Sequence, residues 1–228
     1  MARLPRLALA GGLHHVGLQG HSAAAVFHDD ADRSTFSEML RAAAAHQVVA
    51  IHAYALLDEQ VRLLATPAQG SALGLMMQSL GRRYGAAFNR RHGRSGTLWD
   101  GRFRSSVLQA STTLVDAMVH LERLAVGQGF VEHPAEWSWS SAPHYLGHRR
   151  DAMITEHAGY WKLGNTPFER QSAHADLLQI GLSAERSLAL EDALKRGHAV
   201  GDQDFIRWLA AQSSRPVEPQ ARGRPRMA

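Results

Sequence analysis

The stretch "AYALLDEQVRLLATP", residues 53–67, decides the fold of this chain. A run rich in β-branched and aromatic residues over 48–57 is typical of a buried strand. The polar pair Asp58-Glu59 interrupts it, and a second apolar run over 61–66 follows at once. Two strands joined so closely should pair in antiparallel fashion, so this stretch predicts a β-hairpin.

Two polar side chains in the second strand of this hairpin should point the same way. Side chains alternate along a strand, so Gln60 and Arg62 share one face. A short strand often presents a pair of metal ligands in this manner. Glutamine is a weak metal ligand and a guanidinium is not one, so the pair does not indicate a metal site.

The segments on both sides of the hairpin complete the predicted fold. A strand over 11–21 and a helix over 29–47 precede the hairpin; a helix over 71–93, a strand over 105–111 and a helix over 112–126 follow it. Hairpins mixed with helices, without a repeated βα unit, are typical of the α+β class. The order predicts a ferredoxin-like antiparallel sheet with helices on one face.

The remaining chain is expected to form smaller units. We expect one domain over residues 1–148, a connector over 149–182 that is extended as far as 175, and a C-terminal helical segment over 183–213. That segment should hold helices over 183–197 and 202–212, either as a simple packing appendage or as a small helix–turn–helix-like unit. Residues 214–228 are rich in proline and arginine and are expected to be disordered.

Composition excludes several classes of protein. The 228 residues are 45% hydrophobic and 20% charged, which is ordinary for a globular chain. The chain has no cysteine, so neither disulfide bonds nor cysteine metal sites are available to it. No apolar run reaches the roughly 18 residues that a membrane span needs. We expect a cytoplasmic protein without a membrane partner.

The positive charge is concentrated in two arginine clusters, although the net charge is only +4. Between Gly81 and Arg104 the only acid is Asp100, and the tail "RGRPR" over 222–226 forms the second cluster. Clustered arginine is typical of proteins that bind polyanions, whereas the alternative is a solvated helix face. The tail is similar to an AT-hook-like element, which lies in the minor groove of A·T-rich duplex DNA. We expect contacts to DNA from Arg62, Arg82, Arg83, Arg90, Arg91, Arg94, Arg102, Arg104, Arg222, Arg224 and Arg226, and stacking on bases or packing of the loop from Trp99.

Several motifs resemble one known family, and together they span most of the chain. They are "LHHVGLQGH", "VFHDDADRSTFSEML", "IHAYALL", "FNRRHGRSGTLWDGRF", "HLERLAVGQGFVEHPAEWSWSSAPHYLG" and "ALKRGHAVGDQDFIRWLA" with the final "RGRPR". The chain resembles the REP-associated tyrosine transposases, bacterial members of the HUH single-tyrosine group with an IS200-like transposase domain. The resemblance implies a ferredoxin-like catalytic domain that binds hairpin or single-stranded DNA. It also implies strand cleavage by a tyrosine, assisted by Mg²⁺ or Mn²⁺ on two histidines.

The positions that the resemblance makes catalytic hold other residues here. The family pattern places its two histidines where this chain has Gln60 and Arg62, and its tyrosine where this chain has His120. No tyrosine lies between Tyr84 and Tyr145, so a small shift of the alignment does not restore the nucleophile. We therefore expect a transposase-like protein that binds DNA at a degenerate active site, associated with the bacterial nucleoid, without a cofactor and without this chemistry.

Two alternatives remain open. His52, Glu59 and His120 could form a rearranged nuclease or transposase site, with His120 in place of the tyrosine. A protein–protein module that kept only the fold is the other alternative.

Overall fold

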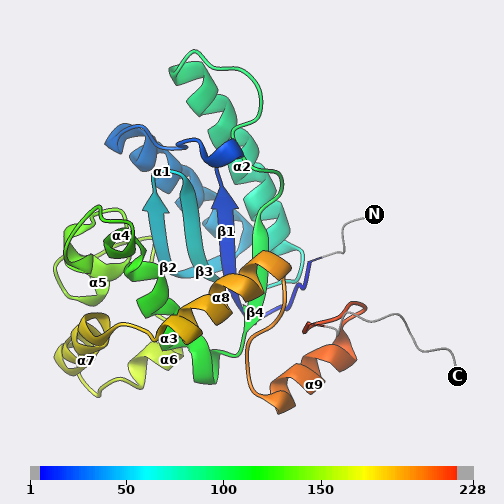
Figure 1. Ribbon diagram of the computed structural model, residues 1–228, viewed down its shortest axis with the longest axis vertical. Helices are drawn as coiled ribbons and strands as arrows, with labels where there is room; N and C mark the ends of the chain where they lie inside the picture. Colours follow the sequence, from blue (N-terminus) through cyan, green and yellow to red (C-terminus); the bar gives the residue numbers. More distant parts are fainter. Residues whose placement is uncertain (1–5, 220–228) are drawn as a thin grey trace, which may run out of the picture.

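The computed structural model describes residues 6–219 and has a four-stranded antiparallel sheet at its centre (Figure 1). The strand order is β2-β3-β1-β4, so β1 pairs with both β3 and β4. The strands are β1 (Leu13–Gln19), β2 (Val49–Leu57), β3 (Gln60–Pro67) and β4 (Arg104–Leu108). A helix joins β1 to β2 and another joins β3 to β4, which confirms the predicted ferredoxin-like fold.

The hairpin of β2 and β3 forms as predicted, with Asp58 and Glu59 as its two-residue turn. Leu57 pairs with Gln60 and Ala55 with Arg62. Alternation along β3 therefore places Gln60 and Arg62 on one face of the sheet.

The first face of the sheet is covered by α1 (Asp30–Gln47) and α2 (Ala72–Arg91). Helix α1 begins where the Asp29 carboxylate accepts a hydrogen bond from the Asp32 backbone N–H. The apolar stripe of α2 includes Tyr84 and packs into the main core with β-strand residues such as Val16 and Leu63. The largest hydrophobic cluster of the described chain lies on this face, and its burial stabilises the packing of the sheet against α1 and α2.

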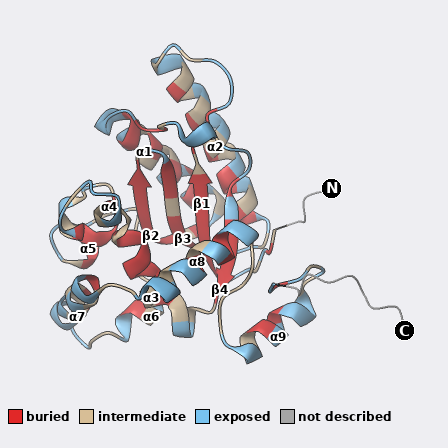
Figure 2. Cartoon of the chain, in the orientation of Figure 1, coloured by how far each residue is buried: buried red, intermediate tan, exposed pale blue. Residues whose placement is uncertain are grey.

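The second face of the sheet is covered by helices as well, whereas helices were expected on one face. Helix α3 (Ala110–Glu122), the short α6 (Ala158–Trp161) and α8 (Ala184–Arg196) pack over it. Figure 1 shows α8 running across the lower part of the sheet beside β1 and β4. Covered on both sides, the strands are almost entirely buried (Figure 2).

The C-terminal third is more helical than the sequence indicated. The prediction of an extended segment over 149–175 is wrong, because α7 (Pro167–Ile180) begins within it. The expected helix over 112–126 is interrupted at Arg123, after which α4 (Leu124–Gly127) follows. The remaining elements are η1 (His21–Ala23), η2 (Pro134–Glu136), α5 (Ala142–Tyr145) and α9 (Gln203–Gln212).

The expected division of the chain at residues 148 and 182 stays a prediction. The basic motif at 222–226 lies outside the described residues. Within residues 6–219, no helix is both long and apolar enough to cross a membrane.

Candidate nucleic-acid interface

Two arginines of the candidate site lie in one row across the sheet, on either side of a glycine. Gly17 in β1 pairs with Arg62 on one side and with Arg104 on the other, so all three belong to the second face. A Cβ atom on Gly17 would lie 3.2 Å from Arg62 Nη1 and 2.9 Å from Leu194 Cδ2. The glycine therefore leaves room for the guanidinium to lie across β1 beneath α8.

Glu191 of α8 joins two of the positions singled out in the sequence. Its Oε2 lies 3.3 Å from Arg62 Nη2, and its Oε1 accepts a hydrogen bond from His120 Nε2 at 3.0 Å. Burial alone would raise the pKa of Glu191, but the bond from His120 and the charge of Arg62 lower that pKa to about 2. Arg62, at the position of a family metal ligand, and His120, at the position of the family nucleophile, thus both contact one ionised carboxylate.

Arg62 forms only weak hydrogen bonds with the rest of the described chain. Its side chain is only 11% exposed, and its bonds to Glu191 and to the Val61 carbonyl, at 3.3 and 3.5 Å, are long. Its buried Nε has no hydrogen-bond partner among residues 6–219. The hydrogen-bonding capacity of this guanidinium is therefore only partly used within the described chain.

His15 lies next to His120, beneath the surface of the same site. It is fully buried, its ring centroid lies 6.1 Å from that of His120, and neither ring nitrogen has a partner in the described chain. Burial lowers its pKa to about 3, assisted by Arg62 and His120, so the ring is neutral at pH 7.

Two adjoining cavities lie between β4 and α8 beside Arg62 and Glu191. The smaller, about 110 Å³, is bounded by Arg62 and Glu191, and the larger, about 340 Å³, continues along the C-terminal end of α8. Both cavities are lined by Asp100, Arg102, Arg104, Leu194 and Lys195. We call this space the basic cleft. Arg6, Arg196 and Arg215 add to its lining, and its only acids among residues 6–219 are Asp100 and Glu191.

A larger groove of about 910 Å³ lies on the other side of the loop that follows α2. Its lining includes Arg82 and Arg102, so it adjoins the basic cleft at Arg102. Trp99 forms one wall, but its indole N–H donates to the Gly81 carbonyl at 3.0 Å and its ring packs near Phe36. Of the two roles considered for Trp99, its contacts favour packing of the loop.

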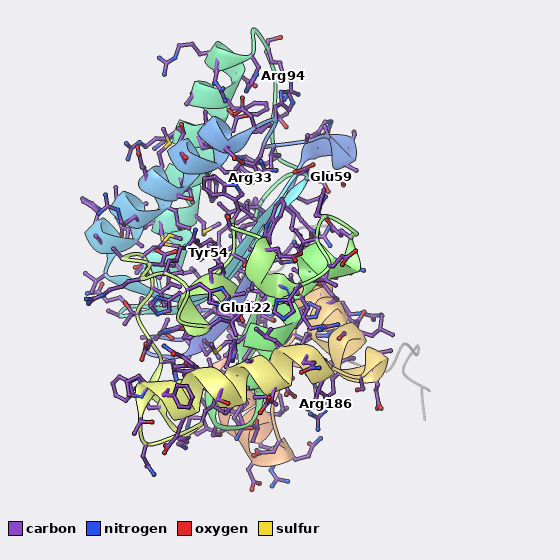
Figure 3. All side chains as sticks on the ribbon, turned by 90° about the vertical axis from the view of Figure 1, so that its left-hand side faces the viewer. Arg33, Tyr54, Glu59, Arg94, Glu122 and Arg186 are labelled. Atoms are coloured by element: carbon purple, nitrogen blue, oxygen red, sulfur yellow. The ribbon has the colours of Figure 1, made fainter. Side chains whose placement is uncertain are left out.

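The remaining arginines of the first cluster do not gather at the cleft. Arg83 and Arg90 are exposed on α2. Arg91 forms ion pairs with Asp29 and Asp32, which gives it a positioning role instead of an open phosphate-binding face. The guanidinium of Arg94 lies 5.5 Å from the ring centroid of Phe88, near the C-terminal end of α2 (Figure 3).

The four tyrosines of the chain are all buried. Tyr54, Tyr84, Tyr145 and Tyr160 are at most 3% exposed. Each hydroxyl donates to another group: the Asp151 carboxylate, the Val26 carbonyl, the His52 carbonyl and the Tyr145 carbonyl, respectively. Burial raises the pKa of each, to about 12 for Tyr160. Figure 3 shows Tyr54 in the interior of the molecule. A phenol in this state is a poor nucleophile for a phosphate in solution.

The structure does not assemble the rearranged site of His52, Glu59 and His120. The ring of His52 is tied to the Thr155 carbonyl at 2.7 Å and to the Thr66 hydroxyl at 2.9 Å. Glu59 is exposed at the hairpin turn, seven residues further along, or about 23 Å in an extended strand. The grouping of these three residues is therefore wrong.

The metal site that the resemblance implies does not fit the side chains present. Gln60 is a weak ligand, and Arg62 places a guanidinium, already paired with Glu191, where a cation would have to bind. A divalent ion there would meet a fixed positive charge.

Glu191 and Lys195 are site residues that sequence reasoning missed. Both lie on α8, one helical turn apart. Their spacing identifies a helix face, but no signal in the sequence pairs that face with β3.

Comparison with known proteins agrees with this fold. No protein-family model matches the chain, and no curated protein matches it. Among solved structures, it is similar to a REP-associated tyrosine transposase bound to a REP hairpin. The TM-score is 0.52 at 13% identity, over 70% of this chain and 93% of the other. A proposed transposase from Deinococcus radiodurans R1 gives a TM-score of 0.37 at 18% identity, over 57% and 95% of the two chains. At these identities the first likeness shows a transposase-like fold, and function has to be argued from the site.

Proposed function

We propose that this chain is a DNA-binding protein with a transposase-like fold that holds hairpin or single-stranded DNA in the basic cleft without cutting it. The observation that carries the proposal is the charge of the basic cleft: Arg62, Arg104 and Lys195 line one cavity, and the only acids among residues 6–219 that line it are Asp100 and Glu191. A phosphate group presents the oxygens that guanidinium and ammonium groups bind.

The shape of the cleft supports a strand as the ligand. It runs from Arg62 past Arg104 to Arg196 at the end of α8, which suits successive phosphates along a backbone better than one small anion. The groove beside Arg82 and Arg102 offers space for a base that is not paired. The printed description of the similar transposase, bound to a REP hairpin, supports a hairpin as the first ligand to test. Such binding implies a location at the nucleoid.

The absence of cutting rests on the groups available at the site. Among residues 6–219, no tyrosine is exposed, and the position of the family nucleophile holds His120, whose Nε2 proton is directed at Glu191. With Gln60 and Arg62 in place of the metal ligands, neither an activated nucleophile nor a bound cation assists cleavage.

Binding is tested by fluorescence anisotropy with a labelled hairpin, the same strand unpaired, and a plain duplex. We expect the first two to bind more tightly than the duplex, and binding to weaken steeply with salt. Arg104→Ala should weaken binding about tenfold, whereas Arg41→Ala, an exposed arginine on α1, should leave it nearly unchanged. Equal loss in both variants would show that the cleft is not the site.

The alternative function is strand cleavage that uses His120. One contact favours it: Glu191 orients the His120 ring, as a carboxylate does for a catalytic histidine. Incubation of the hairpin with Mg²⁺ or Mn²⁺ tests this directly. Metal-dependent nicking that His120→Ala abolishes would replace the binding-only proposal.

A further inference from the structure

A second polar cluster lies away from the basic cleft, where α1 begins and α2 ends. His28 precedes α1, Asp32 lies in its first turn, and His92 follows the last residue of α2. One ligand atom from each of these three residues lies within 4.8 Å of the other two. We propose that they bind one divalent transition-metal ion, with zinc as the representative ion.

The ligand types and spacing suit such an ion. Imidazole nitrogen and carboxylate oxygen both bind zinc, at about 2.0–2.2 Å. Two ligand atoms of a tetrahedral site at those lengths are about 3.3 Å apart. His92 Nε2 and Asp32 Oδ2 are already 2.9 Å apart. The rings of His28 and His92 have centroids 4.5 Å apart, and His28 is exposed, so its side chain has room to turn toward the other two ligand atoms, which lie within 4.8 Å.

The surrounding contacts hold the carboxylate ready for an ion. Asp32 is 2% exposed, and its Oδ2 accepts a hydrogen bond from the His28 backbone N–H at 2.9 Å. Arg91 also donates to Oδ1, and His92 Nε2 lies 3.0 Å from Oδ1 and 2.9 Å from Oδ2, so the carboxylate is held with both oxygens facing His92. Metal binding at His92 Nε2 needs the lone pair of that nitrogen, so the Nε2 proton that faces Asp32 moves to Nδ1 of the same ring or, from a doubly protonated ring, leaves to solvent. The nearby charge of Arg91 weakens the site relative to an all-histidine one.

The position of the cluster indicates what the ion would do. It would link the start of α1 to the end of α2 at the point where the loop over 93–103 leaves the helix. That loop carries Arg102 of the basic cleft. A tetrahedral site with three protein ligands has a fourth position. Because His28 faces solvent, a water molecule can occupy that position.

Calorimetric titration of the untagged, EDTA-treated full chain with ZnCl₂ tests the proposal without DNA. We expect one equivalent to bind, at least tenfold more weakly in His28→Ala and in His92→Ala. His46→Ala removes an exposed histidine elsewhere on α1 and should bind zinc as the wild type does. Circular dichroism confirms that the variants fold. Substitution of Co²⁺ should give visible absorption typical of nitrogen and oxygen ligands, absent in His28→Ala.

Three results would overturn the proposal: no saturable first equivalent, unchanged affinity in both His28→Ala and His92→Ala, or equal loss in His46→Ala. Because no DNA is present, none of them bears on the proposed DNA binding.

Discussion

Glu191 stands between Arg62 and His120, 3.3 Å from the Nη2 atom of the arginine and 3.0 Å from the Nε2 atom of the histidine. A carboxylate and a phosphate present similar oxygens to a guanidinium. Glu191 therefore occupies the place where a phosphate of bound DNA would pair with Arg62. DNA that enters this end of the cleft has to displace that carboxylate or bind beside its negative charge.

The first prediction concerns this competition. Glu191→Gln removes the charge and should tighten hairpin binding about three- to fivefold at low salt, because a partly exposed ion pair contributes up to about 1 kcal/mol. Anisotropy titration measures it. Asp204→Asn, an exposed acid on α9, changes the net charge equally and should have little effect. The prediction fails if both variants tighten binding to the same degree.

The second prediction concerns the glycine beneath Arg62. Gly17→Ala places a Cβ atom 2.9 Å from Leu194 Cδ2 and 3.2 Å from Arg62 Nη1, so α8 and the guanidinium must shift. We expect a loss of about 1–3 kcal/mol in the free energy of unfolding and weaker DNA binding.

Gly74→Ala is the matched control for stability. A Cβ atom on Gly74 would meet nothing within 4 Å, and the residue lies within α2. Alanine there should raise the free energy of unfolding by about 0.5–1 kcal/mol. Urea denaturation compares the two variants, and equal effects would contradict the tight fit at Gly17.

The third prediction concerns pH. Burial lowers the pKa of His15 to about 3 and the pKa values of His14 and His52 to about 4. The unfolded chain protonates these rings near pH 6.5, so between pH 6.5 and about 4 it binds more protons than the folded chain. Stability therefore falls as pH falls through this range, by about 2 kcal/mol per histidine at pH 5.

His15→Leu tests this dependence without the loss of a hydrogen bond, because neither ring nitrogen of His15 has a partner among the described residues. Urea denaturation at pH 7.5 and pH 5.0 should show a drop about 2 kcal/mol smaller in the variant than in the wild type. His46→Leu, at an exposed position, should keep the full drop. A drop that is unchanged in His15→Leu would assign the acid sensitivity elsewhere.

The fold was predictable where its signals are local. The turn at Asp58-Glu59 and the apolar alternation around it define the hairpin, and the stripe that contains Tyr84 defines α2. Helix α7 was missed because few of its residues are buried, so its apolar pattern is weak. A local signal was nevertheless present: Thr166 and Glu169 form a capping box around Pro167.

The candidate site was only partly predictable, because its contacts join distant parts of the chain. Alternation along β3 placed Gln60 and Arg62 on one face, and the resemblance singled out His120. The partner of both Arg62 and His120 is Glu191, which lies 129 residues after Arg62. Similarly, Arg91 belongs to a uniform run of arginines in the sequence, but its pairing with Asp29 and Asp32 depends on how α1 and α2 pack.

The central claim is that the chain binds DNA without cutting it, and one experiment measures both properties. An end-labelled hairpin is incubated with the full chain, with and without Mn²⁺, and bound DNA, nicked DNA and covalent adduct are quantified from the same samples. We expect salt-sensitive binding that Arg104→Ala weakens, with neither nicked strand nor adduct at any metal concentration. Metal-dependent nicking that is lost in His120→Ala, or no binding even at low salt, would contradict it.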